Sequence, residues 1–194
     1  MVSAKGPEVT TAILDACRQG DREAFRVLYE AYKDKVYSMA LYFFHGDAAT
    51  AADVTQHVFL KLLGNIGQFG GDSSFSTWLY RFVANACVDR TRRAGARART
   101  ADPDVLQGMP AAGSHEDDFA RAEIASSVQA AVSALTPKIR LAILLRYFDD
   151  LSYAEMAHVL KCSIGTVASR LSRGHEILAR QLAGFQPSSR MRDR

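Results

Sequence analysis

Two blocks of helical periodicity, separated by one long stretch that has none, constrain the fold of this chain most. From residue 10 onward, apolar residues such as Leu28 and Tyr32 recur three and four positions apart, the spacing of side chains on one face of an α-helix. The pattern stops near residue 94 and returns near residue 119. The residues between are rich in alanine, glycine, proline and charge, which is typical of a linker.

These blocks predict an all-α protein of two small helical domains, because no strand pattern and no internal repeat interrupts them. The length of 194 residues suits that division. The expected organisation is a first domain at 10–94, a flexible linker at 95–121, a second domain at 122–183 and a basic tail at 184–194. No apolar run approaches the ~20 residues of a membrane helix, and the first residues lack a signal-peptide pattern. The sequence therefore predicts a cytoplasmic protein without membrane insertion.

Charge is distributed unevenly, although the formal net charge is only +3. Residues 81–99 contain six arginines and one acidic residue, whereas residues 102–123 contain six acidic residues and one arginine. Charge blocks of this kind indicate a basic surface for a partner beside an acidic, solvated stretch. A polyanion is the natural partner of the basic block, and nucleic acid is the obvious candidate.

The sharpest local pattern lies in the second domain, in "LTPKIRLAILLRYFDDLSYAEMAHVLKCSIGTVASRLSRG". Ser152 and Glu155 fit a capping box at the start of a short helix, "KCS" makes a turn, and Ser163 is placed to cap the next helix. Polar residues share one face of that third helix: Thr166, Ser169, Arg170 and Arg173. Short polar side chains and arginine near a helix N-terminus suit base edges and phosphates in a major groove. The segment predicts a helix-turn-helix, and a merely solvated face is the alternative interpretation.

A second candidate DNA surface lies on the helix expected at residues 75–93, "FSTWLYRFVANACVDRTRR". At about 100° per residue, one stripe of this helix is apolar and a neighbouring stripe carries Arg81, Asn85 and Arg92. Trp78 falls on the border between the stripes, where it can stack on a base while arginine neutralises phosphate. The alternative interpretation is that Trp78 belongs to the core and that the arginines only meet solvent.

No arrangement of residues suggests catalysis or a bound cofactor. The five histidines show no metal-ligand spacing, and no nucleophile–histidine–acid cluster or phosphate-binding loop stands out. Cys17, Cys87 and Cys162 form no Cys-x-x-Cys motif, and we expect small buried hydrophobic residues rather than redox sensors. The sequence thus predicts no enzyme and neither a metal nor a cofactor site.

Two segments resemble a known family. "ADVTQHVFLKLLGNIGQFGGDSSFSTWLYRFVANACVDRTRR", at 52–93, is similar to the central region of bacterial RNA polymerase sigma factors of the extracytoplasmic-function (ECF) group, within the sigma-70 family. The shared patterns are Asp-x-x-Gln-x-x-Phe-Leu, Phe-x-Thr-Trp-Leu-Tyr-Arg and the closing Arg-Arg. The segment at 135–174 resembles the promoter-binding domain of that group. Together they cover both expected domains in the family's order, sigma region 2 and then sigma region 4.

The resemblance implies three binding surfaces. The helix around 54–66 would dock on the clamp coiled coil of the largest subunit of core RNA polymerase, through Asp53, Gln56, His57, Phe59, Leu60 and Leu63. The 75–93 helix, with the loop at 70–74, would open the −10 promoter element and hold its non-template strand, through Phe75, Trp78, Arg81, Asn85, Arg90, Arg92 and Arg93. The third helix of the second domain would read the −35 element as duplex, through Ser163, Thr166, Ser169, Arg170 and Arg173. An anti-sigma factor is a further implied partner.

Three positions depart from the family pattern. His57 stands where glutamate is usual, Lys161 where the turn usually has glycine, and Ala168 where lysine is common. These changes bear on affinity and promoter choice rather than on the class. The alternative function is a helix-turn-helix transcriptional regulator that does not act as a sigma subunit, but it leaves the 52–63 pattern and the Trp78 segment without a role.

Overall fold

Capping side chains set where the helices of the first domain begin. In a computed structural model of the chain, which describes residues 9–98 and 116–183, the Asp21 carboxylate accepts hydrogen bonds from the Glu23 and Ala24 amides and caps the helix that follows. Asp47 accepts from the Thr50 amide at 2.9 Å and starts the next helix. Each cap satisfies backbone donors that have no partner inside the helix.

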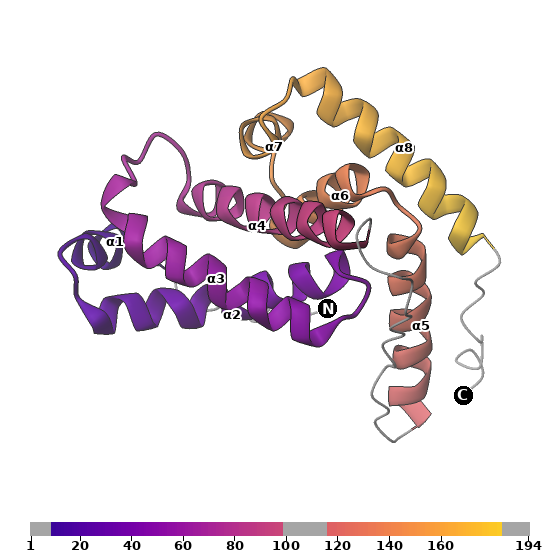
Figure 1. Cartoon of the computed structure of the whole chain (residues 1–194), viewed down its shortest axis with the longest axis horizontal. Helices are drawn as coiled ribbons and strands as arrows, with labels where there is room; N and C mark the ends of the chain where they lie inside the picture. The colour runs from indigo at the N-terminus through magenta and orange to yellow at the C-terminus, as the bar shows by residue number, and fades with distance from the viewer. Residues whose placement is uncertain (1–8, 99–115, 184–194) are drawn as a thin grey trace, which may run out of the picture.

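The first domain consists of four α-helices and one short 3₁₀ turn: α1 (Thr11–Arg18), α2 (Arg22–Phe43), α3 (Ala48–Asn65), η1 (Ile66–Gln68) and α4 (Phe75–Ala98). The long helices α2, α3 and α4 pack on one another around side chains that are entirely buried, including Leu28, Met39, Leu62 and Leu79. In Figure 1, α4 lies above α3 and α2 in the view, and α1 closes the far end. The core therefore holds the outer faces of α3 and α4 in fixed positions.

The second domain has the expected helix-turn-helix. It contains α5 (Glu116–Ser133), α6 (Pro137–Asp149), α7 (Tyr153–Leu160) and α8 (Ile164–Leu182). Both hydrogen bonds of the Ser152–Glu155 capping box are present at the start of α7, and the Ser163 hydroxyl accepts from the Thr166 amide at the start of α8. The all-α prediction is confirmed, since the described residues contain helices and no strand, and none of these helices is long and apolar enough to cross a membrane.

The helices extend into the stretch expected to be a linker. Helix α4 continues to Ala98, past the limit expected at residue 94, and α5 already begins at Glu116. Alanine and arginine after Arg93 are strong helix formers, and the single Gly95 weakens a helix by only about 1 kcal/mol, so the loss of apolar period did not end the helix. The rest of the expected linker and the expected tail at 184–194 lie outside the described residues.

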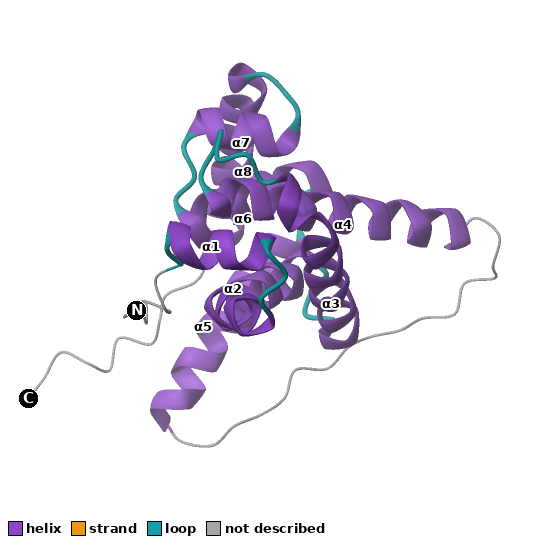
Figure 2. Cartoon of the chain, turned by 90° about the vertical axis from the view of Figure 1, so that its left-hand side faces the viewer, coloured by secondary structure: helices purple, strands orange, loops and turns teal. Residues whose placement is uncertain are grey.

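The two domains pack directly against each other, which the sequence did not predict. Helix α6 contacts α2, and α7 contacts α4, as the views in Figures 1 and 2 agree. The buried apolar side chains of both domains form one continuous cluster. Among the described residues of the second domain, one polar side chain, Arg140, is buried with them and has 4% of its surface exposed.

Candidate docking groove and nucleic-acid interface

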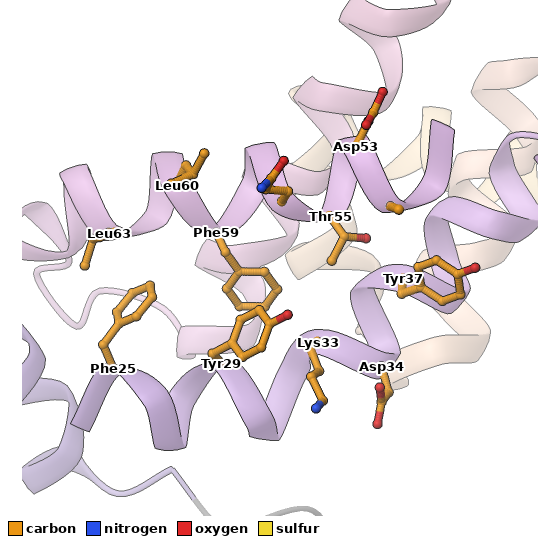
Figure 3. Close-up of a pocket in the computed structure, with 12 residues that line it drawn as sticks. Phe25, Tyr29, Lys33, Asp34, Tyr37, Asp53, Thr55, Phe59, Leu60 and Leu63 are labelled. Atoms are coloured by element: carbon orange, nitrogen blue, oxygen red, sulfur yellow. The ribbon is translucent and has the colours of Figure 1, made fainter. Parts of the chain in front are cut away.

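An apolar groove runs between α2 and α3. Figure 3 shows Leu60 and Leu63 on α3 above Phe25 and Tyr29 on α2. Leu60 is 62% exposed and Leu63 is 52% exposed, so two leucines face solvent on a helix whose other large apolar side chains are buried. The groove has a volume of about 710 Å³. Large apolar side chains gathered in an open groove indicate a site for a partner rather than part of the core.

The residues expected at this surface fall into two groups. Asp53, Gln56 and His57 are exposed along one edge of α3, beside the leucines. Phe59, by contrast, is buried: only 4% of it is exposed, and its ring packs edge-on against Tyr29 with centroids 4.8 Å apart. Phe59 nevertheless lines the groove at its floor, so its expected contact with a partner stays a prediction.

Sequence reasoning missed the α2 side of the groove. Phe25 and Tyr29 line it, and Lys33 and Asp34 stand at its rim. The helical period placed these aromatics on an apolar face, but periodicity alone does not separate a residue inside the core from one at an open edge. Tyr29 is 37% exposed, and Lys33 lies over its ring at 5.8 Å. The groove is thus apolar at its floor and charged at its edge.

Helix α4 presents a basic face toward solvent. Asn85, Arg90, Arg92 and Arg93 are exposed, and Arg81 is partly exposed. Arg92 pairs with Asp89 at 3.2 Å and Arg90 approaches Asp53 of α3 at 3.7 Å, both at the surface. Pairs that open to solvent contribute little to stability and exchange readily for another anion. This face can therefore meet the phosphates of a nucleic acid.

Trp78 occupies the border position that the helical period predicts. Its ring is partly buried, and it packs against Phe82 with centroids 4.8 Å apart and against Phe69 at 5.4 Å. Phe75 is different: it is 7% exposed and packs on Tyr32, so its expected role in contacting DNA is corrected to support of the tryptophan. An aromatic side chain anchored on one side and open on the other is suited to stacking on a base.

A pocket of about 420 Å³ lies beside Trp78 and joins both domains. The loop at 70–74 forms one wall, Thr77 and Arg81 of α4 form another, and Glu155 and His158 of α7 close it. The guanidinium of Arg18 donates a hydrogen bond to the Phe69 carbonyl and fixes the start of this loop. Hydrogen bonds from Ser152 keep the pKa of Glu155 below its ordinary value, with smaller contributions from Thr77 and Ser74, so its carboxylate is charged here.

The recognition face expected on α8 is open. Ser163, Ser169 and Arg173 are exposed, while Thr166 and Arg170 are partly exposed. Val167 and Leu171 are buried on the opposite side and fix the rotation of the helix. The five expected residues thus lie along α8 from its N-cap to its middle. Lys161, in the turn that precedes α8, adopts the left-handed αL conformation with φ 48°.

The cysteines and histidines support no metal site in the described part of the chain, where no group of three or more potential ligands gathers. Cys17 and Cys87 are buried, and burial raises the pKa of the Cys87 thiol to about 12. The expected burial of Cys162 is corrected: this side chain is only half-buried, and its sulfur accepts a long contact from Arg170 at 3.7 Å.

Comparison with known proteins agrees with this arrangement. A sigma-70 region 2 model matches residues 28–97, and a sigma-70 region 4 model matches residues 117–177. The chain is 32% identical to the ECF RNA polymerase sigma factor SigW of Bacillus subtilis, over 85% of this chain and 92% of that protein. It is 33% identical to the RNA polymerase sigma-H factor of Pseudomonas aeruginosa, over 88% and 92%.

A solved complex shows the same fold. The sigma factor RpoE of Bartonella quintana, in complex with the anti-sigma factor NepR, is 21% identical, with a TM-score of 0.67 over 84% of this chain and 99% of that one. Sequence similarity to SigW and sigma-H extends through both domains in the same order. The chain therefore belongs to the extracytoplasmic-function group of the sigma-70 family, and it is an alternative sigma factor, a protein of transcription initiation.

Proposed function

We propose that this chain binds core RNA polymerase through the α2–α3 groove, reads the −35 promoter element with α8 and holds the non-template strand of the −10 element on α4. The observation that carries the proposal is the separation of three exposed surfaces on a common core. One is apolar, around Leu60 and Leu63; one is basic and aromatic, from Trp78 to Arg93; one is polar, at the N-terminal end of α8.

The groove has the character of a helix-binding surface. Exposed Leu60 and Leu63 lie one turn apart on α3, and Phe25 and Tyr29 face them from α2. A groove of this kind accepts the apolar face of a helix, and the polar groups at its edge then select the partner. The coiled coil of the polymerase clamp is such a helical surface.

The two DNA surfaces suit different forms of DNA. Helix α8 presents Thr166, Ser169 and Arg173 to solvent along its N-terminal half, Thr166 in part, which suits a recognition helix in a major groove. Helix α4 instead combines an anchored tryptophan with exposed arginines, which suits unpaired bases and their phosphates. Binding to either should weaken as salt rises, because each phosphate contact releases counterions.

An anti-sigma factor is a proposed second partner. The RpoE structure that shares this fold was solved with the anti-sigma factor NepR. An inhibitor that filled the α2–α3 groove would compete directly with the polymerase for Leu60 and Leu63. The proposed inhibitor therefore carries an amphipathic segment with apolar side chains for this groove.

Run-off transcription tests the proposal. Purified core polymerase is assayed on a pool of promoter fragments with and without this chain, and transcripts that need the chain are expected. Their start sites then give the −10 and −35 elements. The proposal is wrong if the chain neither binds the core polymerase nor starts transcription. If the chain then still binds duplex DNA, that result favours the alternative function of a helix-turn-helix regulator.

A matched pair of variants assigns the groove. Leu63→Glu places a charge in the groove and is expected to reduce core binding at least about tenfold, because a buried charge without a partner is strongly unfavourable. Ile124→Glu makes the same kind of change on α5, at a residue that is 40% exposed and far along the chain from the groove. This control should bind the core like the unaltered protein in a pull-down, and equal binding by Leu63→Glu would remove the groove from the proposal.

A further inference from the structure

The loop that forms one wall of the pocket beside Trp78 is held by a helix far away in the sequence. Arg18 lies in the last turn of α1, and α1 contacts η1. The Arg18 guanidinium donates a hydrogen bond to the Phe69 carbonyl, 51 residues further along the chain. The same guanidinium lies over the Phe69 ring, with Cζ 5.4 Å from the ring centroid. One side chain therefore fixes both the backbone and the ring of Phe69.

Arg18 is itself held in place by α1. Its Nη1 donates to the Asp15 carboxylate, one turn earlier, at 2.5 Å. The dipole of α1 also stabilises a cation in the last turn of the helix. The Arg18 side chain is 30% exposed, so most of it lies against the protein. Contacts with a carboxylate, a carbonyl and a ring at the same time require the planar fork of donors that arginine has and lysine lacks.

The Phe69 ring supports Trp78. Phe69 is buried, and its ring packs against Trp78 with centroids 5.4 Å apart and edge-on against Phe75 with centroids 5.6 Å apart. Phe82 gives the tryptophan ring a further contact at 4.8 Å. Phe69 and Trp78 both line the pocket. A displacement of Phe69 would therefore remove one support of the Trp78 ring and would change the shape of the pocket.

The loop between Phe69 and α4 is anchored at its two ends. Ser74 anchors the end beside α4, where its hydroxyl accepts a hydrogen bond from the Thr77 amide at 3.2 Å. Arg18 anchors the other end, at the Phe69 carbonyl. Two glycines follow Phe69, and the second, Gly71, has φ 85°. Consecutive glycines restrict a backbone little, so the position of the loop depends on the anchors beside them.

We propose that Arg18 is a positioning residue for strand capture: from α1 it holds Phe69, and through Phe69 it sets the loop at 70–74 and the Trp78 ring in the arrangement that receives a base. The inference rests on the proposed function for the identity of the strand. In this role the Arg18 guanidinium binds protein groups rather than a DNA phosphate. Loss of Arg18 should therefore weaken the binding of a single strand and leave the α2–α3 groove and the α8 face unchanged.

Holoenzymes assembled from core polymerase and each variant test this. The probe is a labelled single-stranded DNA of about 12 nucleotides and mixed sequence, and binding by core polymerase alone is subtracted. Arg18→Gln should bind the strand about five- to tenfold more weakly than Arg26→Gln, which corresponds to a partial loss of the stacking of one base. Arg26 is the matched control, because it also pairs with a carboxylate three residues earlier, that of Glu23, but does so at the surface of α2.

Arg18→Lys is the conservative variant. It keeps the charge and a donor for the Phe69 carbonyl but has no planar group to cover the ring, so it should recover part of the affinity that Arg18→Gln loses. Core binding in a pull-down, and binding of duplex DNA by the chain alone, should be equal in Arg18→Gln and Arg26→Gln.

Two failures of the strand-binding experiment are distinguishable. Equal strand affinity of Arg18→Gln and Arg26→Gln, with strand binding by the unaltered holoenzyme intact, overturns the inference alone. If the unaltered holoenzyme holds the strand no better than core polymerase does, the −10 part of the proposed function is wrong and the inference is overturned with it.

The salt dependence of strand binding separates positioning from direct contact. Removal of a phosphate contact reduces the slope of log affinity against log salt concentration by about 0.7–1. The slope should therefore be the same for Arg18→Gln and Arg26→Gln. A smaller slope for Arg18→Gln alone would make Arg18 a phosphate contact and would contradict the positioning role.

Trp78 reports the state of the aromatic cluster without DNA, because it is the only tryptophan of the chain. Its quenching by acrylamide should increase in Arg18→Gln relative to Arg26→Gln, and should increase less in Arg18→Lys, with the folding of all three variants verified by circular dichroism. Weaker strand binding by Arg18→Gln without a change at Trp78 would mean that Arg18 does not act through Phe69, and would overturn the inference.

Discussion

Lys161 holds a left-handed backbone conformation, with φ 48° and ψ 51°, in the turn between α7 and α8. A side chain with a Cβ makes this conformation unfavourable by about 1–2 kcal/mol, whereas glycine adopts it freely. Lys161→Gly should therefore stabilise the protein by about 0.5–1 kcal/mol, the gain being reduced by the greater freedom of glycine in the unfolded chain. Urea denaturation measures the difference.

Lys161→Ala is the matched control, since it removes the same charge but keeps the Cβ. It should show no comparable gain, and an equal gain in both variants would assign the effect to charge.

The family pattern had marked this position as unusual, so the strain was predictable from the sequence. The contact between Glu155 and Thr77 was not predictable. The capping-box pattern predicted the hydrogen bond between Glu155 and Ser152, whereas the contact with Thr77 joins residues from different domains.

At the scale of the helix, Gly174 sets how closely α8 approaches α6. A Cβ at this position would lie 2.7 Å from Cδ1 and Cγ1 of Ile143 and 3.1 Å from Cγ2 of Ile139. Gly174→Ala should therefore destabilise the second domain by about 1–3 kcal/mol through overpacking. Thermal unfolding gives the measurement, and combination with Ile143→Val should recover part of the loss by removing the nearest methyl group.

Gly165→Ala is the comparison on the same helix. A Cβ at this position would have only Ser163 Oγ within 4.0 Å. Here alanine should stabilise the helix by up to about 1 kcal/mol, because alanine has the higher helix propensity. Destabilisation by both substitutions would show that the close contact with Ile143 is not the cause.

The helices and their order followed from the period of apolar residues, but the end of α4 and the start of α3 did not. Helix α3 begins at Ala48, before the apolar pattern that starts near Val54, because the Asp47 cap and the alanines after it favour helix without giving an apolar period. Within the groove, the family pattern indicated Phe59, Leu60 and Leu63 together as docking residues, yet it could not show that Phe59 is buried while the two leucines are exposed. Rotation of a helix by a fraction of a turn decides that, and neighbouring helices set the rotation.

For the whole molecule, the sequence indicated two domains and left their contact unpredicted. The interface uses backbone carbonyls such as that of Phe43 and isolated polar side chains, and neither produces a periodic pattern. One residue carried a signal: Arg140 sits in an otherwise apolar stretch of α6, and a buried cation there requires acceptors from somewhere. Sequence spacing could not say that an acceptor from α2 would be among them.

His45 makes the interface between the two domains sensitive to acid. Burial lowers its pKa and the charge of Arg140 lowers it further, because neutral Nε2 accepts the bond from Arg140 while a protonated ring would be repelled. In the unfolded chain the pKa returns toward its ordinary value of about 6.5. Below that pH the unfolded chain binds a proton that the folded protein does not, so acidification from about pH 7.5 to about pH 5.5 should destabilise the protein.

The expected result is a lower urea midpoint at about pH 5.5 than at about pH 7.5, beyond the general effect of protonating other histidines. His45→Gln separates the two contributions. Glutamine keeps an oxygen that can accept from Arg140, so the interface can still form, but glutamine does not titrate. The urea midpoint of this variant should therefore fall less on acidification than that of the unaltered protein. An identical pH profile for both proteins would mean that protonation of His45 is not coupled to the contact with Arg140.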